Sequence, residues 1–497
     1  MPDSFDLSEG ATRGYLAAGT ALLWLTAVRA LYRLDVPAFW FDEAVSWRNI
    51  NGTWLFQVRR AQGGEDLGGF LYSAILKLWS SVAGCSEYAL RFPSVLFALA
   101  LVGVLWVLGR LLWGQLAGLC VAATATILPG YLDYAREARG YSFLMLATAV
   151  AVLGLVVYRK KRRWGEWLLL LGTGAAIATH SFGLFVWAGV TGAHLWLVWK
   201  LDKPGRSIRA WFHAGAALLP PIVSGIIWTV GTRKTIMRYI DSFWLNHSIL
   251  SECLALLPLV LPVAAALIVL ARDRRKSAHR LAAASILALV GAPILAGPAA
   301  LSAAVGGDHH FILFRYFLGL LPLAALAGGY LLSRLRAPLA AALTVALLAA
   351  AMVHPYTRRQ YEPGGRLNRP IRAVVSFLRD NVSPADCLLV SPPHKYLTLH
   401  YYGLNPSFWG DQTENLFSRR WAQYRAGEFE RRTWVVFFES PDTFDIPPER
   451  LNRPPVVSAG SLTIYRYEPA LIAAPADSTT SASCLSGTAG VQSRAEP

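Results

Sequence analysis

Two adjacent carboxylates, Asp42 and Glu43, are the residues of this chain best suited to chemistry. They follow an apolar stretch, residues 15–34, that has about the 20 residues a helix needs to cross a bilayer. Acidic side chains at the end of a membrane helix are costly unless they are paired or functional. A carboxylate at this interface can act as a general base toward a substrate held in lipid. The alternative is that the pair only solvates the helix end.

A second polar cluster lies between two later apolar stretches. Its charged residues alternate in sign, and a tyrosine follows them: Asp133, Arg136, Glu137, Arg139 and Tyr141. One interpretation is a mutual salt-bridge network. The other is an anion site, because the planar guanidinium of arginine matches the oxygens of a phosphate.

A third cluster consists of Asp308, His309 and His310, followed closely by Arg315 and Tyr316. Arg315 falls at the start of an apolar stretch, and an arginine within a membrane segment is a functional hypothesis by default. The paired histidines make a divalent metal possible, although adjacent residues rarely point at one ion. His180, at a turn between two apolar stretches, is either a helix-end partner or part of the same cavity.

Composition indicates the elements that must position these residues. The chain has 497 residues, 54% of them hydrophobic, and a formal charge of +16. The apolar residues form long blocks, which is typical of a polytopic α-helical membrane protein. The basic residues fall in short stretches between the blocks, so the charge indicates orientation by the positive-inside rule and no nucleic-acid partner is expected.

Placing the dense basic loops on one side requires about eleven transmembrane helices. The predicted spans are 15–34, 88–109, 111–128, 142–158, 166–179, 182–199, 211–230, 249–271, 281–304, 312–333 and 337–353. This arrangement puts all three polar clusters on the outer side. It also makes residues 35–87 a long first outer loop, in which the amphipathic stretch 70–79 is expected to lie on the membrane surface.

The composition changes near residue 354. We therefore expect a transmembrane module over 1–354 and a small α/β domain on the extracytoplasmic side over 355–469. Within that domain, apolar spacing predicts a helix over 371–379. Apolar or alternating runs predict three strands, at 387–390, 434–438 and 462–467. The Ala/Ser/Thr-rich tail, 470–497, is expected to be disordered. No cleavable signal peptide and no disulfide framework are expected.

The clusters resemble, in order, the motifs of the GT-C superfamily of membrane glycosyltransferases. The matching segments are Asp42-Glu43, the Gly-x-Ser-Glu-x-x-x-Arg-x-Pro run at 84–93, the Tyr-x-Arg-Glu-x-Arg-x-Tyr run at 134–141, Thr179-His180 and Arg315-Tyr316. The likeness is greatest to bacterial protein O-mannosyltransferases and lipid A aminoarabinose transferases. It departs at Gly68-Gly69-Phe70, where relatives have His-Pro-Pro, so the identity of the acceptor is not carried over.

The resemblance implies a polyprenyl-phosphate sugar as donor, an acceptor hydroxyl or amine on a glycan, lipid or protein, and inversion at the anomeric carbon. Asp42 would be the general base, with Glu43 beside it. Arg139, Arg315, Arg136 and Tyr141 would bind the donor phosphate. The cavity would be lined by Asp133, Glu137, His180, His309, His310 and Tyr316. The protein would lie in the bacterial inner membrane, in contact with its lipid, with the site extracytoplasmic.

Two other classes stay open on the sequence. One is a transporter or flippase of a lipid-linked sugar, and the other is a noncatalytic partner in envelope polysaccharide assembly. Transporters often contain internal repeats and broken helices near the membrane midplane. This chain instead gathers its polar clusters on one side, which favours the enzyme. The sequence also contains no G-x-x-x-x-G-K-[ST] motif for a phosphate-binding loop and no Asp-x-Asp pair for a metal-bound nucleotide sugar.

Overall fold

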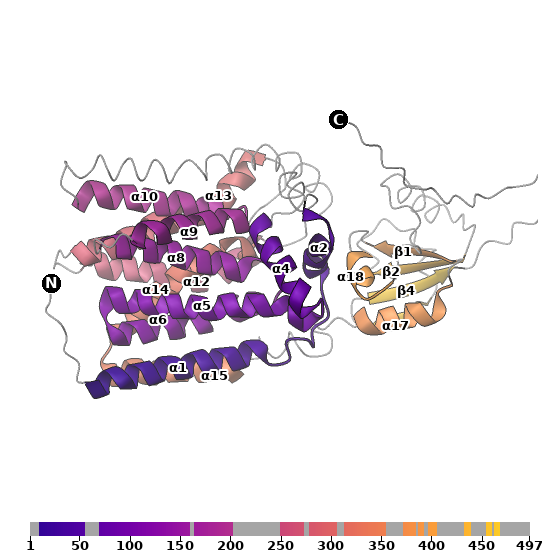
Figure 1. Ribbon diagram of the computed structural model, residues 1–497, viewed down its shortest axis with the longest axis horizontal. Helices are drawn as coiled ribbons and strands as arrows, with labels where there is room; N and C mark the ends of the chain where they lie inside the picture. The colour runs from indigo at the N-terminus through magenta and orange to yellow at the C-terminus, as the bar shows by residue number, and fades with distance from the viewer. Residues whose placement is uncertain are drawn as a thin grey trace, which may run out of the picture.

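The computed structural model describes residues 9–54, 69–159, 164–201, 249–272, 278–305, 313–353, 371–383, 386–391, 396–404, 432–438, 454–459 and 462–467. It contains a bundle of long helices and, at one end of that bundle, a small α/β unit beyond α2 and α4 (Figure 1). The predicted span 211–230, His309, His310 and the tail 470–497 lie outside the described residues.

Long apolar helices form the bundle, since a chain in lipid must satisfy its backbone hydrogen bonds internally. They are α1 (Glu9–Leu31), α5 (Glu87–Trp113), α6 (Gln115–Ile127), α8 (Tyr141–Arg159), α9 (Trp164–Thr179), α10 (Gly183–Leu201), α12 (Ile249–Arg272), α13 (Ala278–Val305), α14 (Leu321–Ser333) and α15 (Ala337–Val353). A 3₁₀ helix, η1 (Phe314–Leu320), leads into α14.

The chain is a polytopic helical membrane protein. Among the described residues, 6 helices are long and apolar enough to cross a membrane. They lie at Arg13–Leu31, Glu87–Trp113, Tyr141–Arg159, Leu250–Arg272, Arg280–Ala300 and Phe314–Ser333. Every predicted span within the described part of the chain coincides with an apolar helix. Several of these helices are shorter than the 6 helices given above. The total of about eleven spans stays a prediction.

The first predicted outer loop is more helical than the sequence suggested. The amphipathic stretch forms α4 (Phe70–Ala83), which buries Tyr72 and Leu76 and exposes Leu78 and Val82. A second helix, α2 (Phe41–Asn51), was not predicted. Asp42 and Glu43 lie in its first turn, where carboxylates interact favourably with the helix dipole. The acidic pair therefore belongs to a helix and is not on an open loop.

The C-terminal α/β unit contains α17 (Ile371–Asn381), β1 (Cys387–Ser391), α18 (Tyr396–Tyr401), β2 (Thr433–Phe437), β3 (Val457–Ala459) and β4 (Leu462–Tyr467). The strand order is β1-β2-β4-β3, with β1 parallel to β2 and the other pairs antiparallel. Leu389 pairs with Val435, and Val435 with Tyr465. α17, β1, β2 and β4 lie where the sequence predicted a helix and three strands. The proposed domain boundaries stay predictions.

Side chains of alternate strand residues face the two sides of this sheet, as the pleat requires. Val374 and Leu378 of α17 pack with Trp434 and Val436 on one side. Val435 and Phe437 belong to a separate apolar cluster on the other side. Ala38, from the segment before α2, is buried in the cluster under α17. The unit thus packs against the segment that carries the acidic pair.

Candidate active site

The Asp42 carboxylate is paired with an arginine that is remote in the sequence. Its Oδ2 atom lies 3.0 Å from Nη1 of Arg315, and both side chains are partly exposed, at 16% and 25%. Arg315 reaches this position from η1, whose start is fixed by a hydrogen bond from the Phe314 amide to Oε2 of Glu252 in α12. Two of the predicted site residues are thereby brought together.

A second arginine approaches Asp42 from the segment between α7 (Tyr131–Ala135) and α8. Nη1 of Arg139 donates a hydrogen bond of 3.3 Å to the backbone carbonyl of Asp42. The Arg139 guanidinium carbon also lies 6.0 Å from the centre of the Tyr141 ring. Two guanidinium groups therefore converge on Asp42 from different parts of the chain, which favours binding of an anion beside the carboxylate.

Close packing keeps η1 against the segment that carries Arg139. Gly130, just before α7, has a φ of 84°, a left-handed conformation that favours glycine. A Cβ atom at this position would lie 2.6 Å from the Phe314 ring. Glycine at residue 130 thus permits the contact that sets Arg315 near Asp42.

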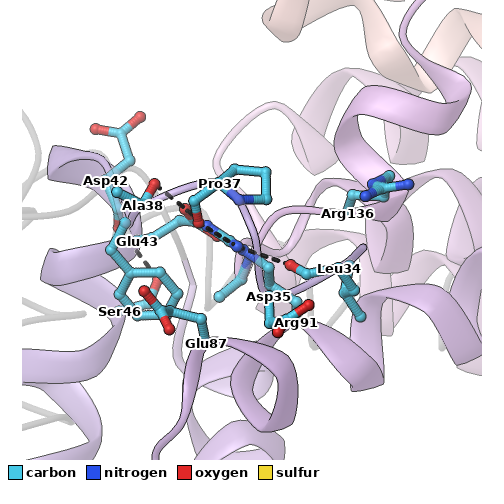
Figure 2. Close-up of polar contacts among 12 residues, drawn as sticks. Leu34, Asp35, Pro37, Ala38, Asp42, Glu43, Ser46, Glu87, Arg91 and Arg136 are labelled. Atoms are coloured by element: carbon cyan, nitrogen blue, oxygen red, sulfur yellow. Dashed lines mark hydrogen bonds and ion pairs between the residues drawn. The ribbon is translucent and has the colours of Figure 1, made fainter. Parts of the chain in front are cut away.

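Glu43 faces away from Asp42 and forms a buried ion pair (Figure 2). Arg91 of α5 donates from Nε and Nη2 to the two carboxylate oxygens, at 2.7 and 2.6 Å. The Ala138 amide donates to the same carboxylate at 3.0 Å. Breaking a buried pair of this kind costs about 3–5 kcal/mol. Glu43 therefore joins α2, α5 and the 136–140 segment, and its contacts are those of a structural residue.

Arg91 is a central residue that the sequence analysis did not assign to the site. Besides Glu43, its Nη1 donates to the carbonyls of Leu34 and Pro37, at 2.8 and 2.7 Å, in the turn before α2 (Figure 2). The available signal was an arginine inside an apolar stretch, which favours a function or a buried partner.

Arg136, an expected phosphate ligand, lies at the end of α1 in the structure. Its guanidinium donates hydrogen bonds to the carbonyls of Arg29, Tyr32 and Arg33 at the end of α1, at 2.8, 2.6 and 3.0 Å. The last carbonyls of a helix lack partners within the helix, and a cation stabilises them. Figure 2 shows Arg136 apart from Asp42, on the other side of the Arg91 contacts.

Glu137 is buried close to the acidic pair. Burial raises the pKa of its carboxyl well above the ordinary value, and the negative charges of Glu43, Asp42 and Asp133 raise it further, while Arg315 lowers it. Its Oε2 atom has no hydrogen-bond partner among the described residues. A carboxyl group in this environment favours the neutral, protonated form.

A small pocket adjoins Arg139. It is lined by Ser46, Gly69, Tyr72, Ser73, Arg139, Gly140, Tyr141, Thr179 and His180. The Gly69 amide donates to the Thr179 carbonyl at 2.7 Å, and a Cβ atom at residue 69 would lie 2.1 Å from the Ala178 oxygen. Glycine at residue 69 is therefore required by the close approach of the two backbones.

Aromatic contacts join this pocket to η1. The His180 ring lies 5.5 Å from that of Tyr141 and 6.4 Å from that of Tyr316, and its Nδ1 accepts a hydrogen bond from the Phe182 amide. The expected phosphate ligand Tyr141 therefore lies with the expected cavity residues His180 and Tyr316, beside Arg139 and Arg315.

His309 and His310, the residues considered for a divalent metal, lie outside the described residues. No group of three or more His, Cys, Asp or Glu side chains in the described part of the chain is arranged to hold an ion. Asp42 and Glu43 each face an arginine, which opposes a cation at the same carboxylate.

Comparisons with known proteins agree with this architecture. Residues 68–228 match the family described as dolichyl-phosphate-mannose-protein mannosyltransferase. The structure of ArnT from Cupriavidus metallidurans bound to undecaprenyl phosphate is similar, with a TM-score of 0.58, 13% identity, and coverage of 93% of this chain and 98% of that one. The apo form of the same protein gives a TM-score of 0.59 at 14% identity, covering 92% and 98%.

The oligosaccharyltransferase of Archaeoglobus fulgidus in its apo form is also similar, with a TM-score of 0.54, 10% identity, and coverage of 85% of this chain and 69% of that one. No curated protein matches the chain by sequence. The fold is thus that of the GT-C membrane glycosyltransferases, which confirms the resemblance inferred from the motifs.

Proposed function

We propose that this protein is an integral-membrane glycosyltransferase that moves a sugar from a polyprenyl phosphate to a hydroxyl or amine of an acceptor. The observation that carries the proposal is the Asp42–Arg315 ion pair, with Arg139 on the Asp42 backbone. It combines a general base with two phosphate-binding groups in one site. The mannosyltransferase family match and the undecaprenyl phosphate bound to ArnT support a lipid-phosphate donor.

In the proposed reaction, Asp42 accepts the proton of the acceptor as its oxygen or nitrogen attacks C1 of the sugar. The bond between C1 and the phosphate oxygen breaks, and the electron pair leaves with the lipid phosphate. Arg139, Arg315 and the Tyr141 hydroxyl would stabilise the charge that develops on that phosphate. One base is enough for this displacement, and it inverts the anomeric carbon.

The inverting geometry requires Arg315 to change partners. The attacking group and the leaving phosphate lie on opposite faces of C1, whereas Arg315 contacts the Asp42 carboxylate in the structure. Binding of the donor phosphate would draw Arg315 away and leave the carboxylate able to accept a proton. Until the donor binds, the ion pair with Arg315 would keep the Asp42 carboxylate in its position.

The orientation follows from charge. Four helices that start at the end of the bundle near α2 and α4 have a basic residue in their last turn: Arg110, Arg159, Lys200 and Arg272. By the positive-inside rule this opposite end is cytoplasmic. The site would therefore be extracytoplasmic, on the outer side of a bacterial inner membrane.

The pocket beside Arg139 favours an uncharged sugar. Its described lining contains hydroxyl groups, an imidazole and one guanidinium, and no carboxylate among the described residues. An aminated sugar would bring a second positive charge next to Arg139, which is unfavourable. We therefore expect a neutral hexose or pentose to be the better donor.

The test is sugar transfer by the purified, lipid-reconstituted protein from synthetic polyprenyl-phosphate sugars, neutral and aminated. We expect Asp42→Asn to lower kcat by at least about 100-fold, the range of a lost general base. Asp380→Asn, on the exposed end of α17, is the matched control. A folded Asp42→Asn variant with full activity would remove Asp42 as the base. Translocation of the intact lipid-linked sugar without any transfer would instead support the transporter class.

A further inference from the structure

The C-terminal α/β unit contacts the segment immediately before Asp42 through one tyrosine hydroxyl. Tyr402 accepts a hydrogen bond from the Phe39 amide at 2.7 Å and donates one to Oε1 of Glu87 at 2.6 Å. Burial and the negative charge of Glu87 raise the pKa of Tyr402, so the hydroxyl keeps the proton that it donates. Phe39 precedes Asp42 by three residues.

Glu87 links this contact to the ion pair beneath Asp42. Glu87 and Arg91 are four residues apart on α5, so they lie on the same side of the helix. Glu87 accepts from Tyr402 and from Nε of Arg372 in α17, whereas Arg91 holds Glu43 and the carbonyls of the turn before it. The turn is therefore held by α5 on one side and by the C-terminal unit on the other.

Further contacts strengthen the attachment to the C-terminal unit. Arg372 donates to the carbonyls of Asp35 and Val36, at 2.6 and 3.2 Å. The Phe39 ring stacks on that of Tyr401, with the ring centres 4.3 Å apart. Residues 35–39 thus contact the unit through both backbone and side-chain atoms.

The start of α2 depends on these external contacts. The residue before the helix, Trp40, makes no side-chain capping bond, although such a bond commonly fixes where a helix begins. The Tyr402 hydroxyl, from outside the helix, holds the backbone amide of Phe39, two residues before α2 begins. The position of that amide sets the direction in which α2 leaves the turn. It therefore also sets the position of the Asp42 carboxylate in the first turn of α2.

We propose that Tyr402 is a positioning residue for Asp42, and that it couples docking of the C-terminal unit to the placement of the first turn of α2. This inference rests on the proposed function, because it takes Asp42 as the general base. Tyr402 touches neither reacting atom, and it acts through the Phe39 amide and Glu87.

Two adjacent tyrosines allow a matched test in the full-length protein. Tyr402→Phe removes the hydroxyl that holds Phe39, whereas Tyr401→Phe removes a hydroxyl that donates to the Cys85 carbonyl. We expect Tyr402→Phe to lower kcat about tenfold with the donor KM within about twofold, as for a misplaced catalytic group. Tyr401→Phe should leave both within about twofold of the wild type. Equal kinetic effects of the two substitutions would overturn the proposal.

Hydrogen exchange provides a second readout that requires no activity. Peptides covering residues 36–44 should exchange faster in Tyr402→Phe than in the wild type or in Tyr401→Phe. Unchanged exchange in Tyr402→Phe overturns the positioning role even where the wild type transfers sugar. A wild type that transfers no sugar overturns the proposed function, while exchange still decides whether Tyr402 holds the start of α2.

A conservative substitution separates positioning from general stability. Glu87→Gln keeps an oxygen that accepts from Tyr402, whereas Glu87→Ala removes it. We expect Glu87→Gln to retain kcat within about threefold and Glu87→Ala to reproduce the loss seen in Tyr402→Phe. Equal activity of the two Glu87 variants would contradict the proposed coupling.

Discussion

At the scale of single residues, nearby charges of the same type have different surroundings. Arg136 and Arg139 are three positions apart, yet one caps α1 and the other contacts Asp42. Asp42 and Glu43 are neighbours, yet one is partly exposed beside Arg315 and the other is 1% exposed against Arg91. Consecutive residues of a helix point about 100° apart, so adjacent carboxylates on α2 face different surroundings. The two members of each pair are therefore expected to respond differently to substitution.

Arg139→Ala should weaken donor binding much more than it lowers stability. Loss of a charged hydrogen-bond donor to phosphate amounts to about 1.5–3 kcal/mol, or roughly 10- to 100-fold in the Kd of the polyprenyl-phosphate sugar. The measurement is the binding of a labelled donor to the purified protein. Arg110→Ala, exposed at the other end of α5, is the control. Unchanged donor affinity would exclude a phosphate role for Arg139.

Arg136→Ala should show the opposite pattern. Removing its hydrogen bonds to the end of α1 should lower the free energy of unfolding by about 2 kcal/mol and should therefore lower Tm. Donor affinity should stay within about twofold of the wild type. Thermal unfolding in lipid, measured alongside donor binding, checks both parts. Weakened donor binding at an unchanged Tm would instead support a role for Arg136 as a phosphate ligand.

Glu137 gives the protein a pH-dependent stability of a defined sign. Its pKa is raised in the folded state, so the folded protein binds more protons than the unfolded chain once the pH exceeds the ordinary value of 4.5. Its contribution to stability is fully present below that value and is lost as the pH rises through the folded pKa. Glu137→Gln, which copies the neutral form, should flatten the fall of Tm with rising pH. The exposed Glu166→Gln serves as control, and identical slopes in all three proteins would contradict the assignment.

At the scale of elements, apolar patterning predicted most helices and three of the four described strands. The runs at 387–390 and 462–467 became β1 and β4 because their apolar residues fit a pleated, buried surface. α2 was missed because its stability does not come from its own sequence. It is short, contains polar residues throughout and makes no side-chain cap, so tertiary contacts from Arg91 and the C-terminal unit hold it.

The site was only partly predictable for a related reason. Asp42 and Arg315 stood out because charges beside apolar stretches are unusual. Their mutual contact depends on how η1 packs against the segment containing Gly130, which no local pattern reveals. Arg91 was signalled only by its place inside an apolar stretch, which does not reveal its partners in the turn before α2. Tyr402 acts through contacts with residues distant in the sequence, so nothing in its neighbours signals a role. His309 and His310 remain predictions outside the described residues.

At the scale of the whole molecule, the described contacts join three parts of the chain around Asp42. The turn before α2 is bound by α5 and by the C-terminal unit, and η1 supplies the arginine that pairs with the carboxylate. Figure 1 shows the sheet unit at the same end of the bundle as α2 and α4. The proposed catalytic geometry therefore depends on the fold of the membrane helices and of the C-terminal unit together.

The glycine at residue 130 gives this arrangement a narrow steric tolerance. Any larger residue there would meet both an unfavourable backbone conformation and the Phe314 ring. The Phe314 ring would have to move away, and the guanidinium of the neighbouring Arg315 would move with it, away from the Asp42 carboxylate. A single added methyl group, distant in sequence from both ionic partners, would thereby widen the gap between base and cation without changing either charge.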